Sequence, residues 1–213
     1  MPRDGPTRPE EAATVLTWDT ATDRLLALAT ADLDDGLPPC PTLAAYAGED
    51  GVALVGLRPF GAGELVGPLL ELAALLLPLG ADRFALALPG RAWSTEDPIP
   101  PVLDEVDLRR TVLTLLRIDG HGPGEPRCAG SLYPYGRGAD GVARFDEPTD
   151  VGWPEGEATG VLRGLLGSGR DRLAAADPSS IVHQFARCLL RGHHVVLAPD
   201  VAEHLEWLTV ARS

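Results

Sequence analysis

The chain has 213 residues, of which 45% are hydrophobic, and its 18 arginines face 31 acidic residues, giving a net charge of −13. It contains no lysine and no asparagine, which excludes Schiff-base lysine enzymes, P-loop ATPases, protein kinases and Ser-Lys or Cys-His-Asn catalysis. Its acidity predicts no binding to nucleic acid or to an anionic membrane, because both would repel it.

The first predicted element is a helix. After a polar tail at residues 1–8, apolar residues recur at steps of three and four over about 9–33, as on one face of a helix. Two short apolar runs then flank Gly48–Gly51 and predict a hairpin of strands at 42–47 and 52–58.

The second predicted helix ends at Leu79 and is apolar nearly all round. We therefore expect more than one neighbour to bury it, with Leu69, Leu72 and Leu76 almost inaccessible.

Strands are predicted in the middle of the chain, at Arg83–Leu88, Leu108–Ile118, Arg127–Tyr135 and, as an edge, Val142–Phe145. Leu108–Ile118 is partly apolar on both faces, which is typical of a central strand. Ala85 and Ala87 share one face of their strand, so we expect a helix to approach closely there.

The last third is predicted to be mainly helical, at 156–167, 170–176, 180–191 and from Pro199 onward. On the helix at 180–191, the expected apolar face consists of Ile181, Phe185, Cys188 and Leu189. The residues between the last two helices, 193–198, are interpreted as a short apolar link.

This order of elements predicts an α+β protein with a mostly antiparallel sheet of about five strands and helices on its faces. The order helix-strand-strand-helix-three strands resembles the profilin-like and roadblock-type arrangement over roughly residues 10–147. The resemblance rests on element order alone and implies an interaction or sensing module. We place a core domain at 9–150 and a helical C-terminal region, packed on it, at 151–213.

Other features indicate the compartment. The longest apolar stretch, 65–79, is too short to span a bilayer, and no apolar run follows the N-terminus as in a signal peptide. Three separated cysteines without a CxxC pair do not form a secreted disulfide framework. We expect a soluble cytoplasmic protein, and the missing lysine and asparagine indicate the codon bias of a high-GC bacterium.

No pattern has the spacing of a known catalytic or cofactor site. Gly61-Ala-Gly precedes a helix but lacks the dinucleotide-binding spacing. The acidic loop after Trp93 is interrupted by prolines and is interpreted as solvated. His121 could act as a general base, yet no motif ties a nucleophile to it. A group of histidines near Cys188 lacks metal-ligand spacing: His183, His193, His194 and His204.

The segment most typical of a protein interface is Ser131–Gly138. Tyr133, Tyr135 and Arg137 alternate onto one side of an extended strand, and Tyr and Arg are favoured at interface hot spots. Because Pro134 cannot donate a ladder hydrogen bond, we expect this stretch at a sheet edge or end. The alternative is a half-buried sheet face that takes aromatic residues.

The sequence therefore predicts a non-enzymatic interaction or scaffold protein that self-associates, most simply as a homodimer. The predicted contact residues are Tyr133, Tyr135, Arg137 and Trp93, with no catalytic residue, cofactor or metal. The alternative is a small-ligand sensor or hydrolase-type enzyme with a site between the Trp93 loop and the tyrosine strand.

Overall fold

The computed structural model describes residues 17–61, 63–92, 109–138, 140–152, 157–169 and 178–210. Its strands are β1 (Thr42–Ala47), β2 (Asp50–Gly56), β3 (Arg83–Ala92), β4 (Arg110–Asp119), β5 (Arg127–Arg137), β6 (Ala143–Phe145), β7 (Thr149–Gly152) and β8 (His194–Leu197). Its helices are α2 (Ala21–Asp34), α3 (Val66–Leu76), α4 (Glu157–Gly164) continuing as the π-helix η1 (Leu165–Gly169), α6 (Pro178–Leu190) and α7 (Pro199–Val210).

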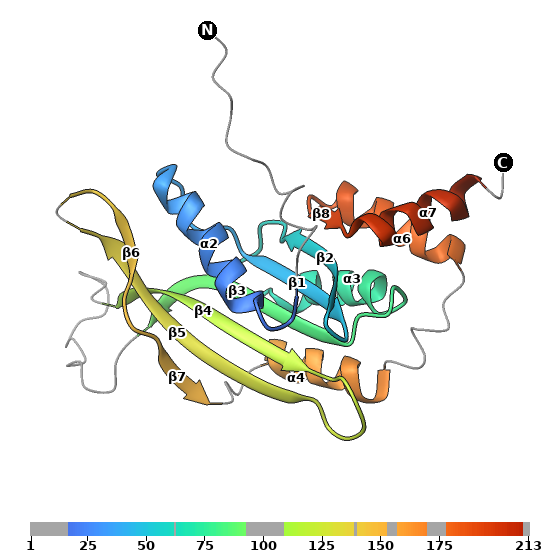
Figure 1. Ribbon diagram of the computed structural model, residues 1–213, viewed down its shortest axis with the longest axis horizontal. Coiled ribbons are helices and arrows are strands. Elements are labelled where there is room, and N and C mark those ends of the chain that lie inside the picture. The colour runs from blue at the N-terminus through green and yellow to red at the C-terminus, as the bar shows by residue number, and fades with distance from the viewer. Residues whose placement is uncertain are drawn as a thin grey trace, which may run out of the picture.

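The strands form one antiparallel sheet in the order β6-β5-β4-β3-β1-β2-β8, and β7 also pairs with β5 (Figure 1). The α+β class and the antiparallel sheet are confirmed, and β4 is a central strand as predicted. The expected count of about five strands is wrong, because the described residues alone form a sheet of eight. These added strands mean that the profilin-like and roadblock-type order does not match exactly.

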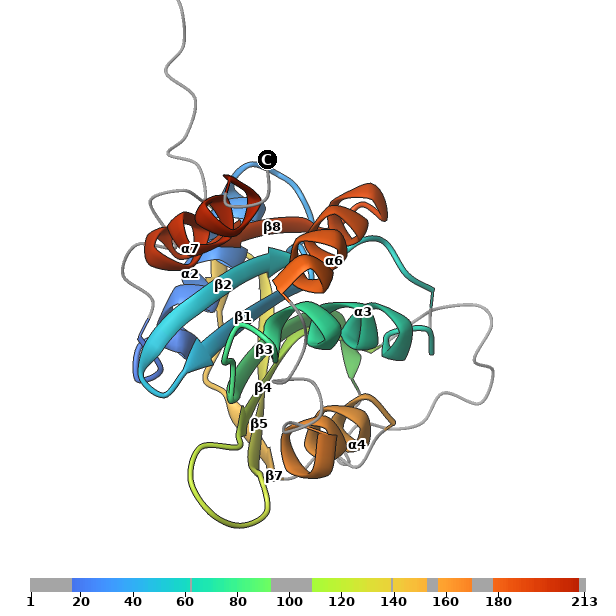
Figure 2. The same ribbon diagram turned by 90° about the vertical axis from the view of Figure 1, so that its right-hand side faces the viewer.

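Helices cover both faces of the sheet (Figure 2). On one face, α2 packs its buried residues against the small side chains of Ala44, Ala85 and Ala87. The close approach predicted at Ala85 and Ala87 is therefore confirmed, since a sheet surface without bulky side chains lets a helix backbone come near. The opposite face is covered by α3, α4 and α6, and it carries the larger apolar core.

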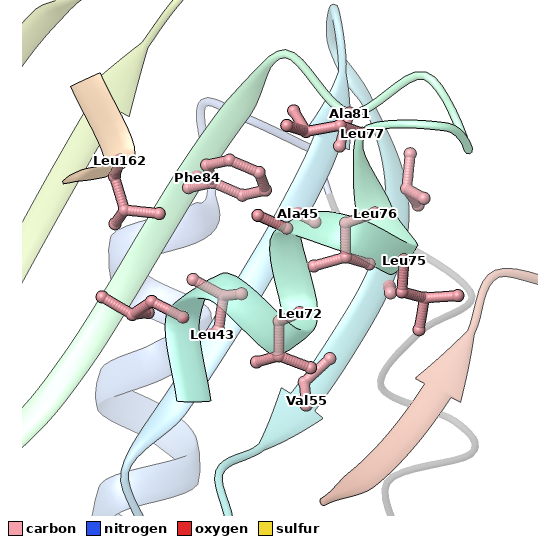
Figure 3. Packing of buried hydrophobic residues seen from close by; sticks show 14 of the residues in the cluster. Leu43, Ala45, Val55, Leu72, Leu75, Leu76, Leu77, Ala81, Phe84 and Leu162 are labelled. Atoms are coloured by element: carbon pink, nitrogen blue, oxygen red, sulfur yellow. The ribbon is translucent and has the colours of Figure 1, made fainter. Parts of the chain in front are cut away.

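The larger core is built around α3 (Figure 3). Leu69, Leu72 and Leu76 are 1%, 0% and 0% exposed, which confirms their predicted burial. They pack on the sheet, while α4 and α6 lie beside α3 on its other sides. An apolar helix in such a position needs several neighbours, because no single one can cover its whole circumference.

The helix predicted over about 9–33 is not continuous in the described residues. Residues Thr17–Thr20 form a bridge and a turn, so the predicted helix is interrupted there before α2 starts at Ala21. Thr17 pairs with Asp50 and the Trp18 N–H donates to the Glu49 carbonyl at 3.1 Å, so this segment is tied to the β1–β2 hairpin. Long-range backbone pairing overrides the apolar period here. The tail at 1–8 and the predicted helix start at 9–16 lie outside the described residues.

The segment interpreted as an apolar link is a strand. β8 pairs with β2 from Ala53↔Leu197 to Gly56↔His194, so the C-terminal region contributes to the same sheet. Without β8, the outer backbone groups of β2 would lack a partner in the ladder. Four residues with weak alternation give no strand signal of their own, which explains why the pattern missed it.

Of the two expected positions for Pro134, the sheet edge is wrong, but the pairing of β5 with β4 does end at Pro134. β5 pairs with β4 on one side and with β6 and β7 on the other. Pro134 lies at the junction of β6 and β7, where its carbonyl accepts from Asp146 N at 2.8 Å. The N–H and carbonyl of a strand residue point to the same neighbour, so the missing donor faces this junction and removes no bond to β4.

Candidate functional site

Tyr133 and Tyr135 lie half-buried on the face of β5 that looks toward α2, within the smaller core. Their rings meet Phe145 of β6 edge-on, with centroids 6.4 and 5.5 Å apart. Burial raises the pKa of both hydroxyls, with Asp150 and Asp23 adding to the rise at Tyr133. Both rings thus have a packing role, and their role toward a partner stays a prediction.

Arg137 ties two backbone segments together. Its guanidinium donates to the carbonyl of Leu33 at the end of α2 and to that of Gly141 at 2.8 Å. Leu37 and Val142, which follow these segments, are 58% and 48% exposed. We name the surface around this anchor the α2–β6 corner and define it by Leu37, Tyr133, Tyr135, Arg137 and Val142. Trp93, the fourth predicted contact residue, lies outside the described residues.

Asp82 and His121 form a second candidate site at the opposite end of the strands. His121 Nδ1 lies 2.7 Å from Asp82 Oδ2, and Asp82 Oδ1 accepts from Gly48 N at 2.8 Å. The Asp82 side chain is 4% exposed, whereas that of His121 is 55% exposed. A buried carboxylate on one ring nitrogen fixes the imidazole orientation, and Nε2 has no hydrogen-bond partner among the described residues, the arrangement that general bases use.

An ion-pair network borders this site. Arg83 Nε donates to Asp119 Oδ1 at 2.9 Å, and Arg127 donates to Asp119 Oδ2 at 3.0 Å. Burial acts to raise the pKa of Asp119, but the hydrogen bonds from Arg83 and from the His121 backbone outweigh it, so the pKa is lowered. Asp119 therefore stays ionised and also holds the His121 backbone through its N–H at 3.0 Å.

Trp18 closes this end of the sheet on the α2 side. The guanidinium groups of Arg117 and Arg83 lie 4.2 and 5.3 Å from its ring centroid, and Tyr46 meets the ring edge-on at 5.5 Å. Burial raises the pKa of Tyr46, and its buried hydroxyl has no hydrogen-bond partner within the described ranges. Such cation–π contacts stabilise the packing of Trp18 against the sheet.

Glu71 of α3 is the centre of a third polar cluster. It accepts from Arg58 Nε at 3.2 Å, from Arg191 and from His193 Nε2 at 3.0 Å. Burial acts to raise the pKa of Glu71, but the hydrogen bonds from Arg58, His193 and Arg191 outweigh it and lower the pKa to about 2. With every oxygen engaged by a protein donor, this cluster joins α3 to the C-terminal region and offers no open position for chemistry.

The cysteines are poor nucleophiles. Cys40, Cys128 and Cys188 are free thiols. Burial raises the pKa of all three, to about 12 for Cys128, and nearby Asp32 and Glu71 add to the rise at Cys40 and Cys188 respectively. Because the thiolate is the reactive form, no thiol here is prepared for attack at neutral pH.

The remaining sequence patterns do not converge on a site. His193 is buried with both ring nitrogens engaged, by Arg58 N and Glu71, while His183, His194 and His204 are exposed. Within the described ranges, no three His, Cys, Asp or Glu side chains are grouped as metal ligands. The Gly61 N–H donates to Glu64 Oε2 at 2.9 Å, so a carboxylate of the protein already occupies this turn.

The sequence does not single out Asp82 or Glu71, because their histidine partners lie 39 and 122 positions away. Among the described helices, none is both long and apolar enough to cross a membrane. No family model, no curated protein and no solved structure matches the chain.

Proposed function

We propose that the chain is a protein-interaction protein that self-associates through the α2–β6 corner. The observation that supports this is the pair of exposed apolar side chains, Leu37 and Val142, on segments that the Arg137 guanidinium holds together. Exposed apolar side chains that belong to a fixed surface lose little conformational freedom on association.

The chemistry of the corner fits a protein partner better than a small ligand. Tyr135 and Tyr133 are half-buried and packed edge-on against Phe145, so the exposed part of each ring has little side-chain entropy to lose on association. Aromatic and guanidinium groups are the side chains that most often dominate interface energies.

Sedimentation velocity tests the proposal at several protein concentrations. We expect the wild type to associate and the double variant Leu37→Ser, Val142→Ser to remain monomeric. Leu70→Ser is the matched control, since Leu70 is 47% exposed on α3, away from the corner. The net charge of −13 opposes association, so added salt should strengthen it by screening. A monomeric wild type at high concentration and high salt would refute the proposal.

A hydrolase-type enzyme is the second candidate, and the Asp82–His121 pair is the observation that favours it. His121 Nε2 would take a proton from water as the water attacks an ester carbonyl, giving an acid and an alcohol. Hydrolysis of p-nitrophenyl acetate tests this reading. The rate should fall in His121→Gln and Asp82→Asn but not in His183→Gln, which alters an exposed histidine on α6. Equal rates for the wild type and the three variants would rule out ester hydrolysis by the Asp82–His121 pair.

A further inference from the structure

A second surface, distinct from the corner, lies on the outer side of α6. Leu190 is 87% exposed and Leu189 is 45% exposed, so the last turn of this helix presents two leucines to solvent. The sequence pattern places Leu189 on the buried face, and that prediction is wrong. Ile181 and Cys188, at 7% and 0%, do face the core, and Phe185 packs against it as predicted.

The charge of this surface is opposite to that of the chain. Residues 178–199 contain no aspartate or glutamate, although 31 acidic residues are spread over the 213 of the chain. Arg187 is exposed and has no ion-pair partner among the described residues. Arg191, which follows Leu190, and Arg58 share the single carboxylate of Glu71, so this group of charges keeps one positive charge in excess.

The surface is also rigidly supported. Gln184 Nε2 donates to the Glu71 backbone carbonyl at 2.9 Å, and α6 packs beside α3 (Figure 2). After the helix, the N–H of buried His193 donates to the Cys188 carbonyl at 3.0 Å, and β8 then joins the sheet. Leu190 and Arg187 therefore project from a helix that is fixed along its inner side.

We propose that the outer face of α6, with Arg187, Leu189, Leu190 and Arg191, binds an acidic partner segment that carries apolar side chains. The exposed leucines would bury the partner's apolar groups, and the surrounding arginines would pair with its carboxylates. Charge complementarity favours this occupant, because a basic partner would instead be drawn to the acidic remainder of the chain. A second copy placing the same face against this one would bring arginines together and is disfavoured.

Fluorescence anisotropy with two labelled helical peptides tests the proposal. One has leucines at i, i+3 and i+4 spacing flanked by glutamates, and the other has lysine in place of each glutamate. We expect the glutamate peptide to bind the wild type, with the Kd rising about tenfold in Arg187→Glu and in Leu190→Ser. Added salt should weaken this binding. Binding of the lysine peptide should not be weakened by either substitution.

The matched control is Leu37→Ser, which removes an exposed leucine from the α2–β6 corner and should leave the Kd for the glutamate peptide unchanged. No binding of this peptide, or equal binding by wild type and both α6 variants, would overturn the proposal. Sedimentation of the α6 variants separates the two surfaces. Loss of self-association in Leu190→Ser with the corner intact would make the occupant a second copy, which also overturns the acidic-partner proposal.

Discussion

His193 Nε2 lies 3.0 Å from Glu71 Oε2, although the two residues are 122 positions apart. His193 Nδ1 accepts from Arg58 N at 3.2 Å, so Nε2 must carry the proton and donate it to Glu71. The neutral imidazole thus joins the end of β2, helix α3 and the start of β8. In addition to the β2 ladder, this contact ties the start of the C-terminal strand to the Glu71 carboxylate.

Replacing Glu71 with Gln should lower the free energy of unfolding by about 1–3 kcal/mol, because it leaves Arg58 and Arg191 without their shared counter-charge. Urea denaturation followed by circular dichroism measures the change. Glu203→Gln, at an exposed position of α7, is the control and should change the midpoint little. Equal midpoints for the two variants would show that the cluster does not stabilise the fold.

The lowered pKa of Glu71 should also make the free energy of unfolding depend on pH. Its pKa is about 2 in the folded protein against an ordinary value of 4.5, so the unfolded chain takes up the proton first as the pH falls. The stabilisation is complete above about pH 5 and is lost as the pH falls toward 2. Asp119, whose pKa is also lowered, acts in the same direction. Thermal midpoints from pH 7 to pH 3 should fall more steeply for the wild type than for Glu71→Gln, and parallel curves would contradict this.

Leu72→Ala should destabilise the protein by about 2–5 kcal/mol, because it removes buried methyl groups and leaves a cavity against α3. Leu72 is 0% exposed, and Leu70, on the same helix, is 47% exposed. Leu70→Ala therefore serves as the control, with an expected loss below about 1 kcal/mol. Chemical denaturation of both variants provides the comparison, and similar midpoints would mean that the helix is not the core.

Asp82 should matter more for stability than His121. Asp82→Ala leaves the Gly48 N–H and the His121 ring without their acceptor, so we expect a loss of about 1–3 kcal/mol. His121→Ala removes a half-exposed ring, and its cost should be below about 1 kcal/mol. Denaturation midpoints measure both. The reverse ranking would show that the ring, rather than the carboxylate, holds the two turns together.

Replacing Tyr133, Tyr135 and Arg137 together with Ala should both weaken self-association and destabilise the fold, because both rings pack on Phe145 and Arg137 anchors α2. Light scattering measures the first effect and thermal unfolding the second. Arg137→Gln alone is the milder variant that separates them, since it keeps the tyrosines. An association unchanged in both variants would place the interface elsewhere.

The amino-acid sequence by itself determined the elements whose signal is local. The glycine-containing segment Gly48–Gly51 specified the β1–β2 hairpin, although β2 starts at Asp50, two residues earlier than predicted. Alternation specified β3 to β5, and the apolar α3 specified a helix buried on several sides. These succeed because turn geometry and side-chain periodicity depend on residues a few positions apart. His121 could be singled out as a possible base, and Tyr133, Tyr135 and Arg137 as one side of a strand, for the same reason.

Only the tertiary structure determined the features that need a partner far away in the sequence. Residues 194–197 form strand β8 because they supply hydrogen-bond partners to the outer backbone groups of β2. Pro134 lies in an inner strand because the position of its missing N–H faces the junction of β6 and β7. Asp82 acquired a role only through His121, and Glu71 only through His193. Such pairings are fixed by chain topology and burial, which bring together residues whose spacing in the sequence carries no periodic signal.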